Sequence, residues 1–280
     1  MNNENVVFVG GAMRSGTTIL HRVLCTAAGS HPYISEAWFL LDLVRLYRAT
    51  LGGYEIRGLD FFGPRTMFDA RMLAMVEAHV GDLARRYYPA SRVFLKHPEL
   101  TAHFPLLGRW FPRSPLVVNI RDPRDTIASM LEVTEKQRAA GAAPMHAAGP
   151  RDIKTLCRVF LDHYRWMDDL PPDQAKRVTL VRYETLMGEP ARALAELEAA
   201  LGLSFDRSRL QAFGETREAS ANLDPAYRGK HPFYGAYFSE LYNRNLTAER
   251  IGRHVEVLTG PEIAEVERLC AGFAARHGYW

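Results

Sequence analysis

The residues with the clearest chemical potential lie in a short glycine-containing stretch near the start of the chain. Residues 6–9 are apolar and β-favouring, and residues 19–27 have the apolar spacing of a helix face. Between them, residues 11–18 read G-x-x-x-x-G-T-T, the spacing of a phosphate-binding loop with threonine in place of its lysine. A strand, a tight loop and a helix N-terminus favour an anion, because backbone N–H groups and the helix dipole converge there. The stretch therefore predicts an anion site.

The cation of this loop is an arginine, three residues before the missing lysine; the loop residues are Arg14, Ser15, Gly16, Thr17 and Thr18. In a P-loop NTPase the lysine reaches the transferred phosphate, and a hydroxyl and an acidic residue hold magnesium. This loop can hold a phosphate, but it lacks the group that handles a transferred γ-phosphate. A glycine-rich turn without a ligand is the alternative, and the arginine and three hydroxyls argue against it.

Other unusual polar residues stand where predicted strands end. Strands are expected at 93–95, 116–120 and 178–181, and a short extended segment at 33–35. The polar residues at the ends of these segments and of the first strand are those of the Arg14 loop, Glu36, Lys96, Arg121 and Tyr183. The carboxyl ends of parallel strands lie at one edge of an open α/β sheet, where ligands bind. These groups are therefore expected around one crevice.

Arg121 and Ser129 form a second candidate anion site. Arg121 stands where a P-loop NTPase carries the acidic residue that binds magnesium, and a cation there favours an anion over a metal. Ser129 lies seven residues beyond Asp122, two helical turns, so it returns to the face of the strand end. The two side chains could clamp one phosphate with a charged fork and a hydroxyl. The alternatives are an ion pair of Arg121 with Asp122 or Asp125, and a packed position for Ser129.

Strand and helix patterns alternate along the chain, which predicts an α/β fold with a parallel sheet flanked by helices on both faces. We expect a single domain over residues 1–280, because neither a repeat nor a clear linker interrupts the pattern. The expected helices cover about 37–50, 66–88, 123–136, 151–169 and 190–201, with a last amphipathic helix near 263–273.

The composition is that of an ordinary globular chain, with 47% apolar and 24% charged residues. A net charge of +3 is too weak to favour nucleic acid as the main partner. The cysteines (Cys25, Cys157 and Cys270) lack metal-ligand spacing and sit in apolar helical patterns, which indicates buried thiols in a reducing compartment. No apolar run approaches the ~20 residues that span a bilayer, and no signal peptide precedes the first strand. We expect a cytoplasmic protein with no membrane partner.

Together these motifs resemble those of the PAPS-dependent sulfotransferases, which move a sulfuryl group from 3′-phosphoadenosine 5′-phosphosulfate (PAPS) to a hydroxyl or amine. In that family R-S-G-[ST]-T holds the 5′-phosphosulfate, and residues 14–18 match it. The 3′-phosphate motif R-D-P-x-D-x-x-x-S is matched by residues 121–129. Weaker family features are K-x-P at 96–98, [RY]-Y-E-x-L at 182–186 and G-Y at 278–279. The resemblance spans nearly the whole chain and implies a sulfotransferase-like, P-loop-type fold.

The match is closest to the branch that includes tyrosylprotein and many bacterial small-molecule sulfotransferases. In that branch a glutamate after the first helix is the base, and Glu36 occupies that place. The cytosolic type uses the histidine of K-T-H, whereas here His97 follows Lys96 directly, so strand alternation should turn it away from Lys96. The protein-modifying members carry a second arginine where this chain has Val133, which favours a small-molecule acceptor.

The resemblance implies direct in-line transfer without a metal and with 3′-phosphoadenosine 5′-phosphate (PAP) as product. Glu36 would take the acceptor proton, and Arg14 with the loop N–H groups would steady the sulfuryl oxygens. Lys96 would neutralise charge on the departing phosphate oxygen. Alternative readings are Glu36 as a cap of the following helix and Lys96 as a solvated strand-end residue.

Two further nucleotide contacts are implied by the family. Tyr183 matches the tyrosine that follows the late strand, near the adenine and 3′-phosphate. Arg253 is placed there by approximate position in the C-terminal segment, with Arg244 as a competitor and an ordinary surface arginine as the alternative.

The acceptor site is expected in the long irregular or inserted parts near the crevice, at 37–90, 138–150 and 219–250. Their aromatic residues favour a partly hydrophobic acceptor, with ordinary core positions as the alternative; they include Trp38, Phe61, Phe62, Phe233 and Tyr237. Two other functions stay open: a metal-dependent P-loop kinase, which the missing lysine disfavours, and a catalytically inactive nucleotide-binding protein. The sequence favours no particular oligomeric state.

Overall fold

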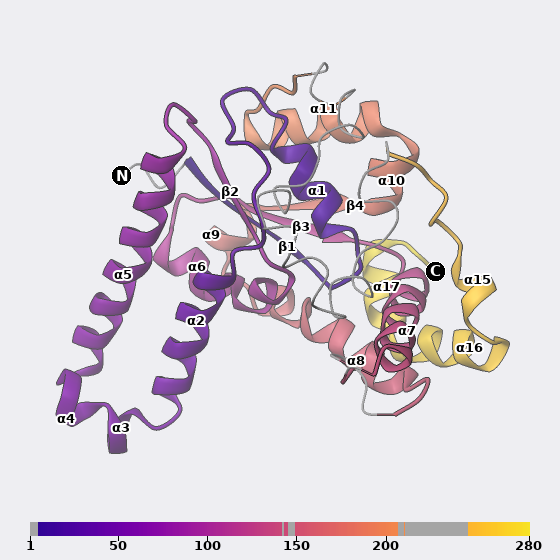
Figure 1. The fold of residues 1–280 in the computed structure, drawn as a ribbon, viewed down its shortest axis with the longest axis horizontal. Coiled ribbons are helices and arrows are strands. Elements are labelled where there is room, and N and C mark those ends of the chain that lie inside the picture. Colours follow the sequence, from indigo (N-terminus) through magenta and orange to yellow (C-terminus); the bar gives the residue numbers. More distant parts are fainter. Residues whose placement is uncertain (1–4, 142, 145–148, 207–209, 211–245) are drawn as a thin grey trace.

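The computed structural model describes residues 5–141, 143–144, 149–206, 210 and 246–280. Its centre is a four-stranded parallel sheet with the strand order β2-β1-β3-β4 (Figure 1). The strands are β1 (Val6–Gly11), β2 (Val93–Lys96), β3 (Leu116–Ile120) and β4 (Val178–Arg182). The expected parallel α/β sheet is therefore confirmed.

The strands follow from runs of apolar residues that are buried on both faces, as a parallel sheet between helices requires. Every residue of β1, β2 and β3 is buried. The register pairs Val9 of β1 with Lys96 on one side and with Val117 on the other. This register brings the carboxyl ends of the strands to one edge of the sheet, where the residues that follow them can meet.

Helices cover both faces of the sheet, and alternate strand residues face opposite layers. Val7 and Val9 pack under one layer, which consists of α1 (Thr17–Leu24), α10 (Tyr183–Gly188) and α11 (Pro190–Leu201). Phe8 packs under the other layer, which includes α2 (Trp38–Leu51), α5 (Arg65–Arg86), α6 (Phe104–Trp110), α7 (Pro123–Ala139) and α8 (Ile153–Asp162). Each such buried side chain contributes about 1.5–3 kcal/mol through burial. None of the helices in the described ranges is both long and apolar enough to cross a bilayer.

The shorter elements differ from the expected pattern. The helix expected at 151–169 ends at Asp162, because the indole of Trp166 donates to the carbonyl of His163, and a 3-10 turn follows. Two short helices lie between α2 and α5, and the helix expected near 263–273 is broken at Cys270. The remaining elements are α3 (Tyr54–Arg57), α4 (Leu59–Phe62), η2 (Pro98–His103), η3 (Arg165–Asp168), α9 (Pro172–Ala175), α15 (His254–Val257), α16 (Gly260–Leu269) and α17 (Ala271–His277).

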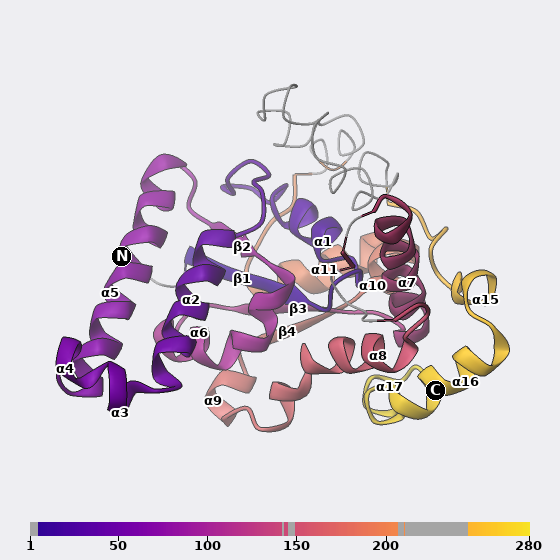
Figure 2. The ribbon, with the colours of Figure 1, turned by 60° about the horizontal axis from the view of Figure 1, so that its bottom comes forward.

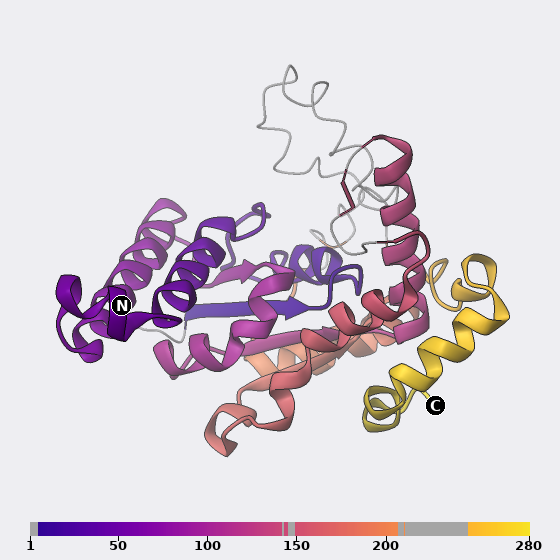
Figure 3. The same cartoon turned by 90° about the horizontal axis from the view of Figure 1, so that it is seen from below.

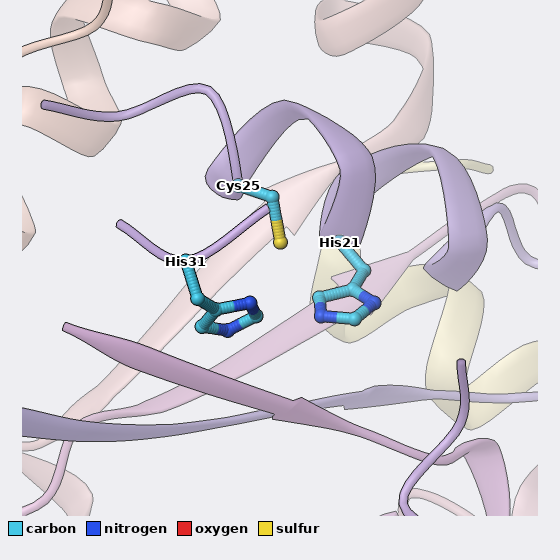
Figure 4. Close-up of side chains that lie close together, drawn as sticks. All are labelled: His21, Cys25 and His31. Atoms are coloured by element: carbon cyan, nitrogen blue, oxygen red, sulfur yellow. The ribbon is translucent and has the colours of Figure 1, made fainter. Parts of the chain in front are cut away.

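Two buried histidines close the open edge of β2 (Figure 4). The N–H of Phe94 donates to Nε2 of His31 at 2.8 Å, and its carbonyl lies 3.1 Å from Nε2 of His21. Nδ1 of His31 in turn lies 2.6 Å from the carbonyl of Pro32. Cys25, free and buried as expected, lies beside them. Because both ring nitrogens of His31 are bonded to backbone groups, we interpret the three side chains as an edge cap of the sheet and not as a metal site.

The edge cap also determines where Glu36 lies. Beyond the histidines, the N–H of Ala37 donates to the carbonyl of Lys96 at 2.8 Å, so the segment ends beside the carboxyl end of β2. Residues 31–37 belong to neither a helix nor a strand, so the short extended segment expected at 33–35 does not add a strand to the sheet. Histidine side chains make the hydrogen bonds that a strand backbone would have made.

Several sequence-based expectations concern residues that lie outside the described ranges. These are most of the acceptor-side segment 219–250, part of 138–150, and the residues Phe233, Tyr237 and Arg244.

Candidate active site

The loop between β1 and α1 has a backbone conformation that suits an anion. Arg14 and Gly16 have positive φ angles of 66° and 101°. Gly16 is the N-cap residue of α1 and provides no side chain to cap it, so the first N–H groups of the helix are left for a bound anion. A Cβ atom at Gly16 would also come within 2.4 Å of the Tyr183 ring. Glycine is therefore required here both by conformation and by space.

Buried polar side chains make hydrogen bonds to the backbone of this loop. The Tyr164 hydroxyl accepts the N–H of Ala12 at 2.8 Å and donates to the carbonyl of Asn119 at 2.8 Å. The side-chain amide of Asn119 donates to the carbonyl of Ser15 at 2.5 Å. Sequence reasoning did not single out Tyr164 or Asn119, since neither belongs to a local motif.

Lys96 joins the loop to Glu36. Its side chain is fully buried, and Nζ donates to Oγ1 of Thr18 at 3.0 Å and to Oε1 of Glu36 at 2.5 Å. The alternative reading of Lys96 as a solvated residue is therefore wrong. The reading of Glu36 as a helix cap is wrong as well, because α2 is preceded by Ala37 and has no side-chain cap.

His97 lies on the other side of the same carboxylate. Its Nε2 is 3.6 Å from Oε2 of Glu36, and its side chain is 3% exposed. His97 was expected to turn away from Lys96, and the two side chains reach different oxygens of the same carboxylate. The contact of His97 with Glu36 was not predicted from the sequence, because it depends on how the segment before α2 lies beside the carboxyl end of β2.

Opposing influences set the pKa values of Glu36 and His97. Burial raises the pKa of Glu36, but the ammonium of Lys96 and the ring of His97 lower it, and the net effect is a pKa below the usual value. Burial lowers the pKa of His97, against an opposing effect of the Glu36 carboxylate. At neutral pH the site therefore holds a carboxylate, an ammonium and a neutral imidazole.

Arg121 lies at the same edge and faces the loop. Its guanidinium stacks over the ring of Tyr183 at 4.3 Å. Nη1 donates to the carbonyl of Arg14 at 3.1 Å, and Nη2 donates to the carbonyl of Arg250 at 2.5 Å. Nε is buried and has no hydrogen-bond partner within the described part of the chain. The ion pair expected as an alternative is present only as a long contact of 3.9 Å to Asp125.

Ser129 brings the two predicted anion motifs together. It is only partly buried, and its hydroxyl oxygen lies 3.2 Å from Nε of Arg14. The packed position considered for Ser129 is therefore not observed. Asp122 does not pair with Arg121 and instead binds Arg124 at 2.7 Å while capping α7. The geometry places Arg14, Arg121 and Ser129 around one polar region.

Asp125 anchors a C-terminal segment to this region. Its Oδ2 accepts the N–H of Gly252 at 2.8 Å, and its Oδ1 accepts the N–H of His254 at 3.0 Å. Nδ1 of His254 lies 2.8 Å from the same Oδ1. The sequence analysis used Asp125 only as a possible ion-pair partner of Arg121. The sequence signal for this contact is Gly252, which lies between the basic residues Arg250 and Arg253.

Two arginines of this segment lie over α7. Arg253 Nη2 is 3.3 Å from Oε1 of Glu132, and Arg250 Nη1 is 3.4 Å from Oε2 of the same carboxylate. The Arg253 side chain is 37% exposed, and its Nε is buried. Glu132 lies one turn beyond Ser129 along α7. Both arginines are therefore near the predicted 3′-phosphate residues.

The two weaker motifs at 182–186 and 278–279 contact each other. The guanidinium of Arg182 stacks on the ring of Tyr279 at 4.0 Å, and the Tyr279 hydroxyl donates to Glu184 at 3.2 Å. The other oxygen of Glu184 accepts the N–H of Asp122 at 2.8 Å, and burial raises the pKa of this carboxyl. These motifs support the backbone that carries Arg121.

The aromatic residues proposed for the acceptor divide into two groups. Trp38 is 48% exposed and its ring lies edge-on to His97 at 4.3 Å, so it borders the site. Phe61 is 81% exposed and Phe62 packs on Phe68, both near the opposite end of α2 (Figures 2 and 3). Phe61 and Phe62 therefore lie away from Trp38, and their part in an acceptor site stays a prediction.

The fold and site define a parallel α/β protein with a P-loop-like turn after β1 and further cations at the same sheet edge. The chain belongs to the sulfotransferase family: the family model described as "Sulfotransferase family" matches residues 6–207. A putative protein-tyrosine sulfotransferase of Caenorhabditis briggsae is 28% identical over 212 residues, which cover 75% of this chain and 69% of that protein. These findings confirm the family that the motifs resemble.

Solved sulfotransferases share the fold. The sulfotransferase domain from the curacin biosynthetic pathway aligns with a TM-score of 0.62 and 17% identity, covering 96% of this chain and 97% of that one. Mouse sulfotransferase SULT7A1, solved in complex with PAP, aligns with a TM-score of 0.54 and 12% identity, covering 97% and 85%. At these identities the likeness concerns the fold of the sheet and its helices.

Proposed function

We propose that the chain transfers a sulfuryl group from PAPS to a hydroxyl or amine of a small-molecule acceptor, by direct in-line displacement. The observation that carries this proposal is the buried bridge of Lys96 between Thr18 of the loop and Glu36. It places a fixed positive charge between the group that would hold the phosphosulfate and the group that would take the acceptor proton. Membership of the sulfotransferase family supports the reaction class.

The residues at the sheet edge fit an adenosine nucleotide with phosphates at both ends. The open N-terminus of α1, with Ser15, Gly16, Thr17 and Thr18, suits the 5′ group. The orphaned, buried Nε of Arg121 suits the 3′-phosphate, and Ser129 and Arg253 lie within the same region. The Tyr183 ring stacks against the Arg121 guanidinium and lies close to Gly16 of the loop. The PAP complex of the mouse neighbour supports this assignment.

Bound PAPS would supply an activated sulfuryl group on a mixed phosphate–sulfate anhydride. Glu36 takes the acceptor proton as the general base. Arg14 and the loop N–H groups hold charge on the sulfuryl oxygens, and Lys96 steadies the charge left on the phosphate oxygen. Each of these groups belongs to the chain itself, and we propose that no metal takes part.

The acceptor is proposed to enter beside Glu36, from the side of Trp38. The half-exposed Trp38 ring offers apolar surface next to the base, which favours a partly hydrophobic acceptor. Val133 stands where protein-modifying relatives are expected to carry a second arginine, which favours a small molecule over a protein. We also propose that residues 1–280 act as one domain, with part of 37–90 on the acceptor side.

The test is a screen of phenols, alcohols and amines with ³⁵S-labelled PAPS, followed by kinetics of two variants. Glu36→Gln should lower kcat by about 10²–10⁴-fold with little change in PAP affinity, because the amide cannot take the proton. Asp42→Asn is the matched control, because it removes an exposed carboxylate from α2 near the site. The control should retain wild-type kinetics.

Each alternative function predicts a different result from the same assays. Tight PAP binding without transfer to any acceptor would indicate an inactive nucleotide-binding protein. Magnesium-dependent ATP hydrolysis would indicate a kinase-like activity. Full activity of Glu36→Gln would remove Glu36 as the base while leaving the reaction class in place.

A further inference from the structure

His97 is a buried residue beside the base, and the reaction as proposed does not use it. Its ring is 2% exposed and lies edge-on to Trp38. Nδ1 accepts the N–H of Glu99 at 3.1 Å and thereby caps the short helix η2. A neutral imidazole that accepts at Nδ1 carries its proton at Nε2. The backbone of η2 therefore determines which nitrogen of His97 can donate.

The proton on Nε2 faces Glu36. Nε2 lies 3.6 Å from Oε2 of the carboxylate, while Oε1 is taken by Lys96. Nε2 is buried and makes no hydrogen bond within the described residues. A small rotation of the Glu36 carboxylate would bring Oε2 into hydrogen-bond range of this N–H. A buried N–H without an acceptor is costly, so the site favours that rotation.

The charges around His97 keep it neutral. Burial lowers its pKa, and the ammonium of Lys96 and the guanidinium of Arg45 act in the same direction. The carboxylates of Glu36 and Glu99 act against this, and the net pKa is below the usual value. With Nδ1 occupied and Nε2 protonated, the ring has no lone pair to offer an acceptor proton. His97 is therefore a hydrogen-bond donor at neutral pH and not a second base.

We infer that His97 is a positioning residue, which holds Oε2 of Glu36 through Nε2–H and keeps the carboxylate turned toward the acceptor. The inference rests on the proposed role of Glu36 as base. In the protein as described, Lys96 fixes only Oε1, and Lys96 is also the group proposed to act on the phosphate oxygen. A carboxylate held by Lys96 alone would lose its orientation when Lys96 moves. His97 fixes the second oxygen, so that Oε1 stays turned toward the acceptor once Lys96 has moved away from it.

The two ring nitrogens can be tested separately. In His97→Asn the side-chain amide reaches the position of Nδ1 and keeps the cap of η2, whereas in His97→Gln it reaches Nε2 and keeps an N–H toward Glu36. We expect His97→Asn to lower kcat roughly 10-fold with an unchanged KM for PAPS, and His97→Gln to restore most of kcat. The acid limb of the kcat profile should move to higher pH in His97→Asn. The opposite ranking of the variants would make His97 a helix cap only and overturn the inference.

A measurement without turnover separates this inference from the proposed function. The pKa of the Glu36 carboxyl, followed by ¹³C NMR titration, should be higher in His97→Asn than in wild type and near wild type in His97→Gln. His79→Asn on α5 is the matched control and should leave the Glu36 pKa and kcat unchanged, since its ring packs on Phe39. An unchanged Glu36 pKa in His97→Asn overturns the inference. The expected NMR result in a protein without sulfuryl transfer overturns only the proposed function.

Discussion

In the proposed mechanism, Glu36 is a weak base as long as Lys96 binds its carboxylate. The ammonium is 2.5 Å from Oε1 and helps to lower the pKa of the carboxyl, although burial acts in the opposite direction. An anion that draws Lys96 toward Thr18 would leave burial as the main influence on Glu36. Its pKa would then rise, which makes the carboxylate a better base at neutral pH. On this proposal, Lys96 would keep the carboxylate weakly basic until an anion binds to the loop.

At the residue scale, Arg121 provides the sharpest test of the nucleotide assignment. Arg121→Ala should weaken PAP binding by roughly 30–100-fold, because a buried guanidinium hydrogen-bonded to phosphate is lost. Binding of AMP, which has no 3′-phosphate, should change by less than about 3-fold. Isothermal titration calorimetry with both nucleotides measures the difference.

The control for Arg121 is Arg158→Ala, an exposed arginine on α8, which should leave both affinities unchanged. Equal losses for PAP and AMP in Arg121→Ala would mean that this guanidinium does not contact the 3′-phosphate. Its contacts to the carbonyls of Arg14 and Arg250 would then be structural.

At the element scale, the edge of β2 depends on neutral histidines. The carbonyl of Phe94 accepts from Nε2 of His21, and burial lowers the pKa of His21 far below 6.5. The folded protein keeps this ring neutral, whereas the unfolded chain protonates it below about pH 6.5. The stability that His21 contributes is therefore present above that pH and is lost as the pH falls below it.

His21→Gln tests this cap, because the glutamine amide can donate to Phe94 but does not titrate. Relative to wild type, the free energy of unfolding of the variant should increase by about 1 kcal/mol between pH 6 and pH 5. Urea unfolding at pH 8, 6 and 5 measures this change, with pH 8 as the internal reference. A parallel decline of both proteins would show that His21 does not titrate on unfolding.

Local sequence patterns predicted the sheet and much of the site. The apolar runs identified β1 to β4, and the spacing within 121–129 placed Arg121 and Ser129 on the strand end and helix that the structure shows. These features depend on neighbouring residues along the chain. The edge cap does not, because His21 and His31 act on Phe94, which lies more than sixty residues away. For the same reason the contact of His97 with Glu36 was not predicted.

At the scale of the whole molecule, the C-terminal part of the chain packs against the region around Arg121. Figure 1 shows α15 and α16 beside α7, and Phe273 of α17 packs on Phe160 of α8. Tyr279 holds Glu184, and Glu184 holds the backbone of Asp122, next to Arg121. Asp125 accepts hydrogen bonds from the backbone of the segment at 250–254. The second candidate anion site is therefore assembled from the middle and the end of the chain.

Asp125→Asn should loosen this assembly without removing a group that is proposed to touch the nucleotide. An amide NH₂ in place of Oδ2 would face the N–H of Gly252, so that hydrogen bond would be lost. We expect the amides of Gly252 and His254 to exchange roughly 10-fold faster and PAP affinity to fall about 10-fold, while AMP affinity changes little. Hydrogen exchange followed by NMR measures the first effect, and calorimetry measures the second. Asp162→Asn, an exposed carboxylate on α8, should change neither. Faster exchange with unchanged PAP affinity would separate the segment at 250–254 from the 3′-phosphate and leave Arg121 and Ser129 as its remaining candidates.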